Sequence, residues 1–195
     1  ALLRAADVHT VVAAVPEPGD VGEDEAARRI GDAVAGENLT ASRAFTGRVN
    51  LFAAEAGLAV YDRTLLDRLN RIDEAITIAA VPPFAPVEPR QMVATIKIIP
   101  FAVREDPLAR CTAAVAEAGG LFRVARYLPH RVGLVQTTLP GTREKVLEKT
   151  VDILRGRVES VAGTLAGETR CRHEVSALSR EIGAWLSERC TMVLV

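Results

Sequence analysis

Short runs of β-branched and other apolar residues alternate with amphipathic segments along the first hundred positions. The apolar runs predict strands, and the segments with apolar residues at helical spacing predict helices. The predicted strands cover 8–15, 39–45, 58–61, 76–81 and 92–101, and the predicted helices cover 20–35, 51–56, 62–72 and 106–118. Asp62 is expected to cap one of these helices, because aspartate is a favoured N-cap residue. This part of the chain therefore predicts a mixed α/β fold.

From residue 121 onward, single strands and single helices are expected to alternate. Strand 121–127 is followed by an apolar strand, Val132–Val135, a polar loop, Gln136–Gly141, and a helix, Thr142–Leu154. The order continues with strand 157–162, polar loop 163–172, helix His173–Leu186 and strand 191–195. Strands that alternate with helices in this way favour βαβ units and a parallel sheet.

These patterns divide the chain into three parts. Residues 1–104 are expected to form a smaller mixed α/β domain, residues 105–130 a connecting helix and strand, and residues 131–195 the first part of an α/β domain with a parallel sheet. The last apolar run, Met192–Val195, predicts a strand whose following loop is not in the sequence. The second domain is therefore expected to be truncated at its C-terminus.

Composition narrows the class of protein. The chain has 195 residues, of which 49% are hydrophobic, and a net charge of −1, so it can bury a sizeable core and shows no charge preference for nucleic acid or an acidic membrane. No uninterrupted apolar segment has the length of a membrane span. Its three cysteines, Cys111, Cys171 and Cys190, are widely spaced and form no metal-binding pair, which favours a reduced, cytoplasmic protein.

The polar loop after Val135 is the main candidate for a binding site. Carboxyl ends of parallel strands and helix N-termini favour anionic ligands, and here Thr137, Thr138 and Gly141 precede a helix that Thr142 is expected to cap. Two interpretations stay open at this stage. The loop forms either a pocket for a small anionic molecule or an ordinary strand–helix turn whose threonines only cap.

A second polar group lies in the upstream domain. Thr46, Arg48 and Asn50 either line a pocket or form a helix cap and its surface neighbours. Lys97 is the one charged residue inside the predicted strand 92–101. A lysine in such a strand lies at a sheet edge or points at an anion, and we expect the edge.

The order of elements from Arg131 to Val195 resembles the first half of a molybdopterin-binding domain. This is the α/β domain shared by molybdenum-cofactor biosynthesis proteins and gephyrin. Farther upstream, Gly47–Phe52, Ile72–Thr77 and Gln91–Val103 resemble a bacterial group of molybdopterin-binding proteins that carry an extra domain before the pterin-binding one.

The resemblance implies that the protein binds molybdopterin during the synthesis or handling of the molybdenum cofactor, and that it forms a homo-oligomer. The residues implied in binding the ligand are Thr137, Thr138, Gly141, Thr142, Arg172 and Glu174. An adenylyltransferase or molybdenumtransferase activity, which would use Mg²⁺ and ATP, is left open, and no catalytic residue or metal site is assigned. Family members commonly have acidic residues in the first loop, where this chain has Thr137–Pro140.

Two alternatives come from other classes of function. One is a non-catalytic binding or scaffold module that keeps the fold without the transferase chemistry. The other is a sensor of a different anionic ligand, bound in the upstream domain by Arg48, Asn50 and Lys97.

Overall fold

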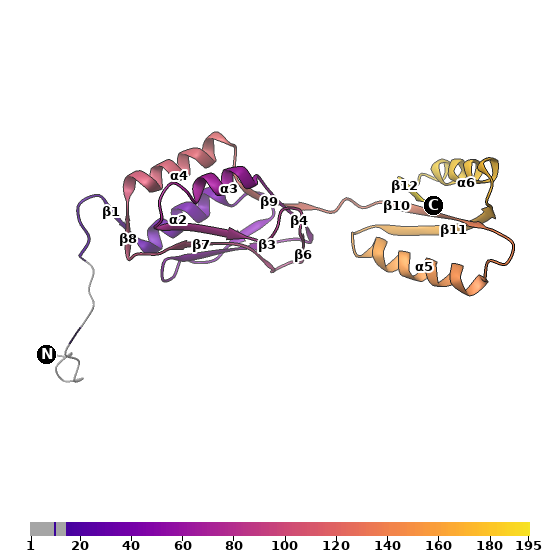
Figure 1. The fold of residues 1–195 in the computed structure, drawn as a ribbon, viewed down its shortest axis with the longest axis horizontal. Coiled ribbons are helices and arrows are strands. Elements are labelled where there is room, and N and C mark those ends of the chain that lie inside the picture. The colour runs from indigo at the N-terminus through magenta and orange to yellow at the C-terminus, as the bar shows by residue number, and fades with distance from the viewer. Residues whose placement is uncertain (1–9, 11–14) are drawn as a thin grey trace. The chain divides into compact units, whose positions relative to one another are not determined.

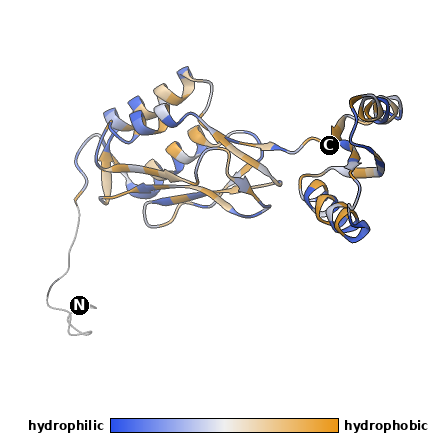
Figure 2. Ribbon diagram, turned by 45° about the vertical axis from the view of Figure 1, so that its right-hand side comes forward, coloured by the Kyte–Doolittle hydropathy of each residue, from blue (hydrophilic) through white to orange (hydrophobic). Residues whose placement is uncertain are grey.

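The computed structural model of the protein describes residue 10 and residues 15–195, and the predicted strand 8–15 lies almost wholly outside this part. The chain divides into two compact units, unit 1 from Ala1 to Arg126 and unit 2 from Tyr127 to Val195. Five helices and several sheets in the described residues make the protein a mixed α/β structure (Figure 1), and the sheet near the C-terminus is parallel. Helices of both units show bands of hydrophobic and hydrophilic residues, as expected for elements that cover a sheet (Figure 2).

Unit 1 is built from antiparallel sheets and three helices. Its elements are β1 (Asp20–Gly22), α2 (Glu23–Val34), β2 (Leu39–Ala41), β3 (Arg48–Ala53), β4 (Gly57–Tyr61), α3 (Arg63–Leu69), β5 (Ile76–Ala80), β6 (Pro86–Val87), β7 (Met92–Ile98), β8 (Ala102–Arg104), α4 (Glu105–Glu117) and β9 (Phe122–Arg126). The largest sheet has the order β2-β3-β7-β5, and smaller sheets have the orders β6-β4-β9 and β1-β8. Asp62 caps α3, as predicted, because its side chain accepts hydrogen bonds from the backbone N–H groups of Thr64 and Leu65.

The core of unit 1 lies between α2 and one face of the four-stranded sheet. The buried residues of α2, which include Ile30 and Val34, recur at helical spacing and pack against β3 and β7. A glycine lets the helix lie close to the sheet, since a Cβ at Gly31 would be 2.8 Å from the Cγ1 atom of Val49. Among the described residues, α2 is the helix that packs on β3 and β7, and Figure 1 shows α2 and α4 on the same side of these strands.

The predicted helix 51–56 is wrong, because β3 continues through these residues to Ala53. Residues 48–53 alternate between exposed or half-buried and buried positions, which is the period of a strand. Pairing with β2 on one side and β7 on the other satisfies the backbone of this segment. Alternating burial therefore overrides the helical preference of the alanines that follow Phe52.

The stretch expected to connect the two domains, residues 105–130, contributes α4 and β9 to unit 1. Strand β9 is antiparallel to β4, so the parallel alternation predicted from residue 121 begins only at β10. The side chain of Phe122 explains this pairing: it is 2% exposed and packs edge-to-face on Tyr61, with ring centroids 5.0 Å apart.

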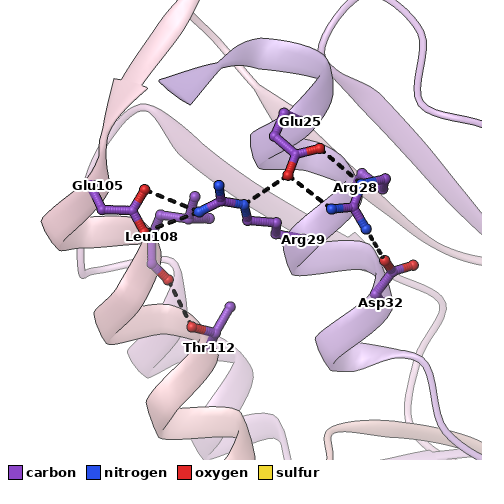
Figure 3. A network of polar contacts seen from close by, with 7 residues as sticks. All are labelled: Glu25, Arg28, Arg29, Asp32, Glu105, Leu108 and Thr112. Atoms are coloured by element: carbon purple, nitrogen blue, oxygen red, sulfur yellow. Dashed lines mark hydrogen bonds and ion pairs between the residues drawn. The ribbon is translucent and has the colours of Figure 1, made fainter. Parts of the chain in front are cut away.

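An exposed ion-pair network joins the start of α4 to α2 (Figure 3). The guanidinium of Arg28 bonds Glu25 at 2.8 Å and Asp32 at 2.6 Å, and Arg29 bonds Glu25 at 2.9 Å and Glu105 at 3.0 Å. Hydrogen bonds from these two arginines lower the pKa of the Glu25 carboxyl to about 2, and they raise the pKa of both guanidinium groups. Glu25 is thus the carboxylate on which both arginines of α2 converge.

We expect Glu25→Gln to lower the melting temperature slightly at pH 7, since exposed ion pairs contribute little. The pKa of Glu25 is lower in the folded protein than its ordinary value of 4.5, so the stability it contributes is present above that value and is lost as the pH falls toward 2. The difference between the variant and the wild type should therefore shrink across this window. Thermal melts by circular dichroism at low salt measure it, and a difference that is constant with pH would contradict the assignment.

Unit 2 is a three-stranded parallel sheet with one helix on each face. Its elements are β10 (Arg131–Thr138), α5 (Glu144–Glu159), β11 (Thr164–Arg172), α6 (Val175–Ser187) and β12 (Met192–Leu194). The strand order is β11-β10-β12, so β10 is the central strand and pairs in parallel on both sides. Alternate residues of β10 face opposite helices: Gln136 bonds Leu147 of α5, and Gly133 lies under Trp185 of α6. Figure 1 shows α5 and α6 on opposite sides of the sheet.

Two predicted elements of unit 2 are wrong. The predicted strand 157–162 is the last turn of α5 and the turn after it, where Val158 is buried on the helix and Ala162 has a φ of 60°. The predicted polar loop 163–172 is strand β11, which pairs with β10 along its length. Its polar residues alternate with small ones, and the small residues face α6 while Glu168 and Arg170 face α5. A strand with one polar face does not show the continuous apolar run that marked β10.

Trp185, the one tryptophan of the chain, packs on two glycines that are paired across β10 and β11. A Cβ at Gly133 would be 2.5 Å from the Cγ atom of Trp185, and a Cβ at Gly167 would be 2.8 Å from its Cη2 atom. The indole N–H donates to the hydroxyl of Thr169 at 3.2 Å. The flat surface of the two glycines therefore fixes the distance between α6 and the sheet.

We expect Gly133→Ala to destabilise unit 2 by about 1–3 kcal/mol, because the added methyl group overlaps the buried indole. Gly156→Ala is the matched control, since a Cβ at this position in α5 meets nothing within 4 Å. It should stabilise the unit by about 0.5–1 kcal/mol. Urea denaturation followed by tryptophan fluorescence measures both changes, and equal effects of the two substitutions would contradict this packing.

Candidate functional site

Strands β10 and β11 end at the same level of the sheet. Their register pairs Gln136 with Arg170, Thr137 with Cys171 and Thr138 with Arg172. The predicted loop Gln136–Gly141 therefore begins later than expected, because pairing with β11 extends β10 through Thr138. The carboxyl end of β10 thus carries two threonines beside the carboxyl end of β11.

The third strand runs in the same direction on the other side of β10. Leu134 is opposite Leu194, so the carboxyl end of β12 lies at the level of the middle of β10. The chain leaves β10 through α5 toward one edge of the sheet and returns through α6 to the other edge. In open α/β sheets, a crevice for ligands forms at the carboxyl ends of strands where the connections diverge in this way.

The hydroxyls of the two threonines contact the segment at the end of β11. The Oγ1 atom of Thr137 is 2.9 Å from the Nδ1 atom of His173, and the hydroxyl of Thr138 donates to the carbonyl of Cys171 at 3.2 Å. The backbone N–H of His173 donates to the carbonyl of Thr138 at 3.3 Å. These bonds fix both strand ends, so the threonines, which are half-buried, are structural elements of this edge.

A tight turn follows β10. The hydroxyl of Thr142 accepts from the N–H of Leu139 at 3.0 Å, and its own N–H donates to the carbonyl of Leu139 at 3.0 Å. Gly141 has a φ of 88°, a left-handed conformation that glycine adopts without strain. The prediction that Thr142 caps the helix is wrong, because α5 begins at Glu144 and Arg143 is its N-cap residue without a side-chain cap. The turn therefore uses the hydroxyl that was expected at the helix end.

Arg172 and Glu174 lie at the end of β11 and the start of α6. The backbone of Arg172 pairs with Thr138, its side chain is exposed, and it forms no ion pair among residues 15–195. Glu174 is the N-cap residue of α6, and its side chain makes no capping bond. The structure thus brings Thr137, Thr138 and Arg172 together, with Gly141 and Thr142 in the adjoining turn and Glu174 after the strand.

A polar network lies beneath this edge, and the predicted site residues did not include it. Gln136 is 8% exposed, and its amide donates to the carbonyl of Leu147 at 3.1 Å and to Glu168 at 2.6 Å. The guanidinium of Arg170 bonds Glu168 at 2.6 Å and also reaches Glu144 in the first turn of α5. These carboxylates raise the pKa of Arg170. The network ties α5 to the sheet through charge-assisted bonds.

One signal for this network was present in the sequence. Glu168, Arg170 and Arg172 stand at alternate positions, which is the spacing of one strand face. Because the segment was interpreted as a loop, nothing in the sequence placed Glu144 near Arg170, which is 26 residues away.

We expect Gln136→Leu to destabilise unit 2 by about 1–3 kcal/mol, because it removes both buried hydrogen bonds and leaves the carboxylate of Glu168 with one donor fewer. Gln91→Leu, at an exposed turn of unit 1, is the matched control and should change stability by less than about 0.5 kcal/mol. Urea denaturation measures both changes, followed by the fluorescence of Trp185 for unit 2 and by circular dichroism for the whole chain. A neutral effect of Gln136→Leu would show that the network contributes nothing to folding.

The upstream polar residues also come together. Arg48 is directly opposite Lys97, and Asn50 is opposite Thr95, on the face of the sheet away from α2. The expectation of Lys97 at a sheet edge is wrong, because β7 is paired with β3 on one side and β5 on the other. Thr46 lies in the tight turn before β3, with a φ of 48°.

Comparison of the chain with protein-family models, with curated proteins and with solved structures gives no match. Across residues 15–195, no group of three or more histidine, cysteine, aspartate or glutamate side chains is placed to hold a metal ion. None of the helices in the described part of the chain is long and apolar enough to cross a membrane.

Proposed function

We propose that unit 2 is an α/β unit of the molybdopterin-binding type and that the protein acts in the synthesis or handling of the molybdenum cofactor. One observation carries the proposal: the parallel order β11-β10-β12 places Thr137 and Thr138 at the carboxyl edge of the central strand. The family that the chain resembles binds its pterin at this kind of edge. The assignment concerns the fold and the ligand, and it needs no catalytic step.

The donors at this edge suit an anionic, oxygen-rich ligand. Thr137 offers the hydroxyl of a half-buried side chain, and Arg172 offers a guanidinium that no carboxylate of the described residues neutralises. The first turn of α5 adds Lys145 and backbone N–H groups without a side-chain cap, and helix N-termini attract anions. These residues would hold the phosphate and the polar pterin edge of molybdopterin, with Gly141 and Thr142 shaping the turn beside it.

A non-catalytic binding or scaffold role is the second candidate, and one observation favours it. Metal-assisted adenylyl or molybdenum transfer with Mg²⁺ and ATP needs carboxylates that are available to a cation. Two carboxylates close to the edge, Glu144 and Glu168, are instead bound to Arg170. Glu174 is an exposed carboxylate at this end of β11, and it stands alone at the start of α6. The residues present thus support binding more directly than transfer.

We also propose a cytoplasmic location and a homo-oligomeric state, as in the family that the chain resembles. Cys111, Cys171 and Cys190 are free and buried, which is compatible with a reducing compartment.

We expect Arg172→Gln to weaken molybdopterin binding by about tenfold, since a charge-assisted bond contributes about 1.5–3 kcal/mol. Thr137→Val should weaken it by about fivefold, because it keeps the shape of the side chain and removes one hydrogen bond. Anaerobic titration of the protein with molybdopterin measures both affinities.

Arg180→Gln is the matched control, because Arg180 is an exposed arginine on α6 whose guanidinium contacts its neighbour Glu181. Its affinity for molybdopterin should equal that of the wild type. If the wild type binds and all three variants bind equally well, the site is not at this edge. If the wild type itself does not bind molybdopterin, the proposed function is wrong.

A further inference from the structure

The face of the four-stranded sheet away from α2 carries side chains from three cross-strand rows. Directly opposed residues of antiparallel strands point to the same face, and alternate residues of one strand do so as well. We define the open face by ten residues: Phe45, Arg48, Lys97 and Thr77 in the first row, Asn50, Thr95 and Ala79 in the second, and Thr40, Phe52 and Met92 in the third. In the described part of the chain, the helix that packs against β3 and β7 is α2, and it lies on the opposite, buried face.

The first row contains two like charges in direct opposition. Arg48 of β3 is the cross-strand partner of Lys97 of β7, in the middle of the sheet. Residues paired in this way have Cβ atoms about 4.5–5.5 Å apart, and like charges there are destabilising. Neither side chain forms an ion pair with any described residue. The pair therefore places two positive charges side by side without a bound carboxylate. The carboxylate of Asp24 instead accepts a hydrogen bond from the backbone N–H of Gly47, the residue before Arg48, at 2.8 Å.

The open face as a whole also has an excess of positive charge. The chain has 25 acidic and 24 basic residues, yet none of the ten residues of the open face is acidic. Arg28 and Arg29 on α2, by contrast, are matched by the carboxylates of Glu25, Asp32 and Glu105. A face without carboxylates leaves the pair free to meet a negative charge from outside the chain.

Neutral donors lie beside the charged pair. The hydroxyl of Thr95 donates to the Oδ1 atom of Asn50 at 2.7 Å, and the Nδ2 group of Asn50 has no hydrogen-bond partner among the described residues. Thr77, opposite Lys97 on the other side, adds a hydroxyl to the first row. Two cations with an amide and a hydroxyl next to them form a donor set suited to a phosphate group.

The third row supplies an apolar and hollowed surface at the other end of the face. A hollow of about 550 Å³ is bordered by Thr40, Phe52 and Arg90, together with Ala53 and Ala54. Arg48 and Phe52 are four residues apart on β3, which corresponds to about 13 Å along a strand. A molecule with a phosphate at one end and an apolar or planar body spans this distance.

We propose that the open face of unit 1 binds a small organic phosphate. Its phosphate lies between Arg48 and Lys97, its polar middle part contacts Asn50 and Thr95, and its body extends toward Phe52 and the adjacent hollow. This site is in unit 1 and uses none of the residues assigned to molybdopterin in unit 2. It gives the upstream unit a ligand-binding function of its own.

NMR titration of the ¹⁵N-labelled full chain tests the proposal with three probes: inorganic pyrophosphate, adenosine monophosphate and adenosine. Pyrophosphate should shift the signals of Arg48, Asn50 and Lys97. Adenosine monophosphate should shift these and also the signals of Phe52 and Arg90, whereas adenosine alone should bind at least tenfold more weakly. The double variant R48Q/K97Q should bind both phosphates at least tenfold more weakly than the wild type, and R48Q alone should give an intermediate loss.

The double variant R63Q/R110Q is the control, because it removes the same charge from exposed helical positions of unit 1 and should bind like the wild type. The same spectra report whether each variant is folded. Equal binding by the wild type and R48Q/K97Q, or shifts confined to unit 2, would overturn the proposal. Tight binding of a single-stranded oligonucleotide without binding of the two small phosphates would also overturn it.

Discussion

Unit 2 depends on the pairing of β10 in parallel on both of its edges and on the burial of both of its faces. The run Val132–Val135 is continuously apolar because one side of it meets α5 and the other meets α6. Two glycines on the α6 side bring Trp185 down onto the sheet, and Gln136 on the α5 side holds the start of the facing helix. These constraints fix where β10 ends, and thereby bring its two threonines to the same edge as Arg172.

Elements with a single clear periodicity could be predicted from the sequence. The apolar core of β10, the helices α5 and α6, the capped helix α3 and the final strand β12 all lie where their patterns place them, within a few residues. Strand β11 was missed because its polar face is satisfied by partners on α5, so no continuous apolar run marks it. Strand β3 was missed, because residues 46–50 were interpreted as a pocket lining or helix cap and residues 51–56 as an alanine-rich helix. Its pairing with β2 and β7 shows that Arg48–Ala53 is extended.

The candidate sites, like the secondary structure, could be predicted from the sequence only in part. Thr137 and Thr138 were predicted from the expected end of a strand, and Arg172 was implied by the family resemblance. The structure pairs Thr138 with Arg172 at the same edge of the sheet. The link from Arg170 to Glu144 could not be predicted, because it joins β11 to α5, which only the parallel crossover brings into contact. Arg48, Asn50 and Lys97 were grouped only in one alternative hypothesis, because the register between β3 and β7 cannot be predicted from the sequence. Their position on one face, opposite the core, is a property of the antiparallel pairing.

The burial of all three thiols gives each unit its own chemical reporter. Burial raises the pKa of the Cys111 thiol to about 11, so an alkylating reagent at neutral pH finds almost no thiolate while unit 1 is closed. Cys171 and Cys190 belong to the core of unit 2. The modification rate at each cysteine then measures how often the surrounding unit opens. Peptide mapping of the alkylated positions separates the local opening of unit 1 from that of unit 2.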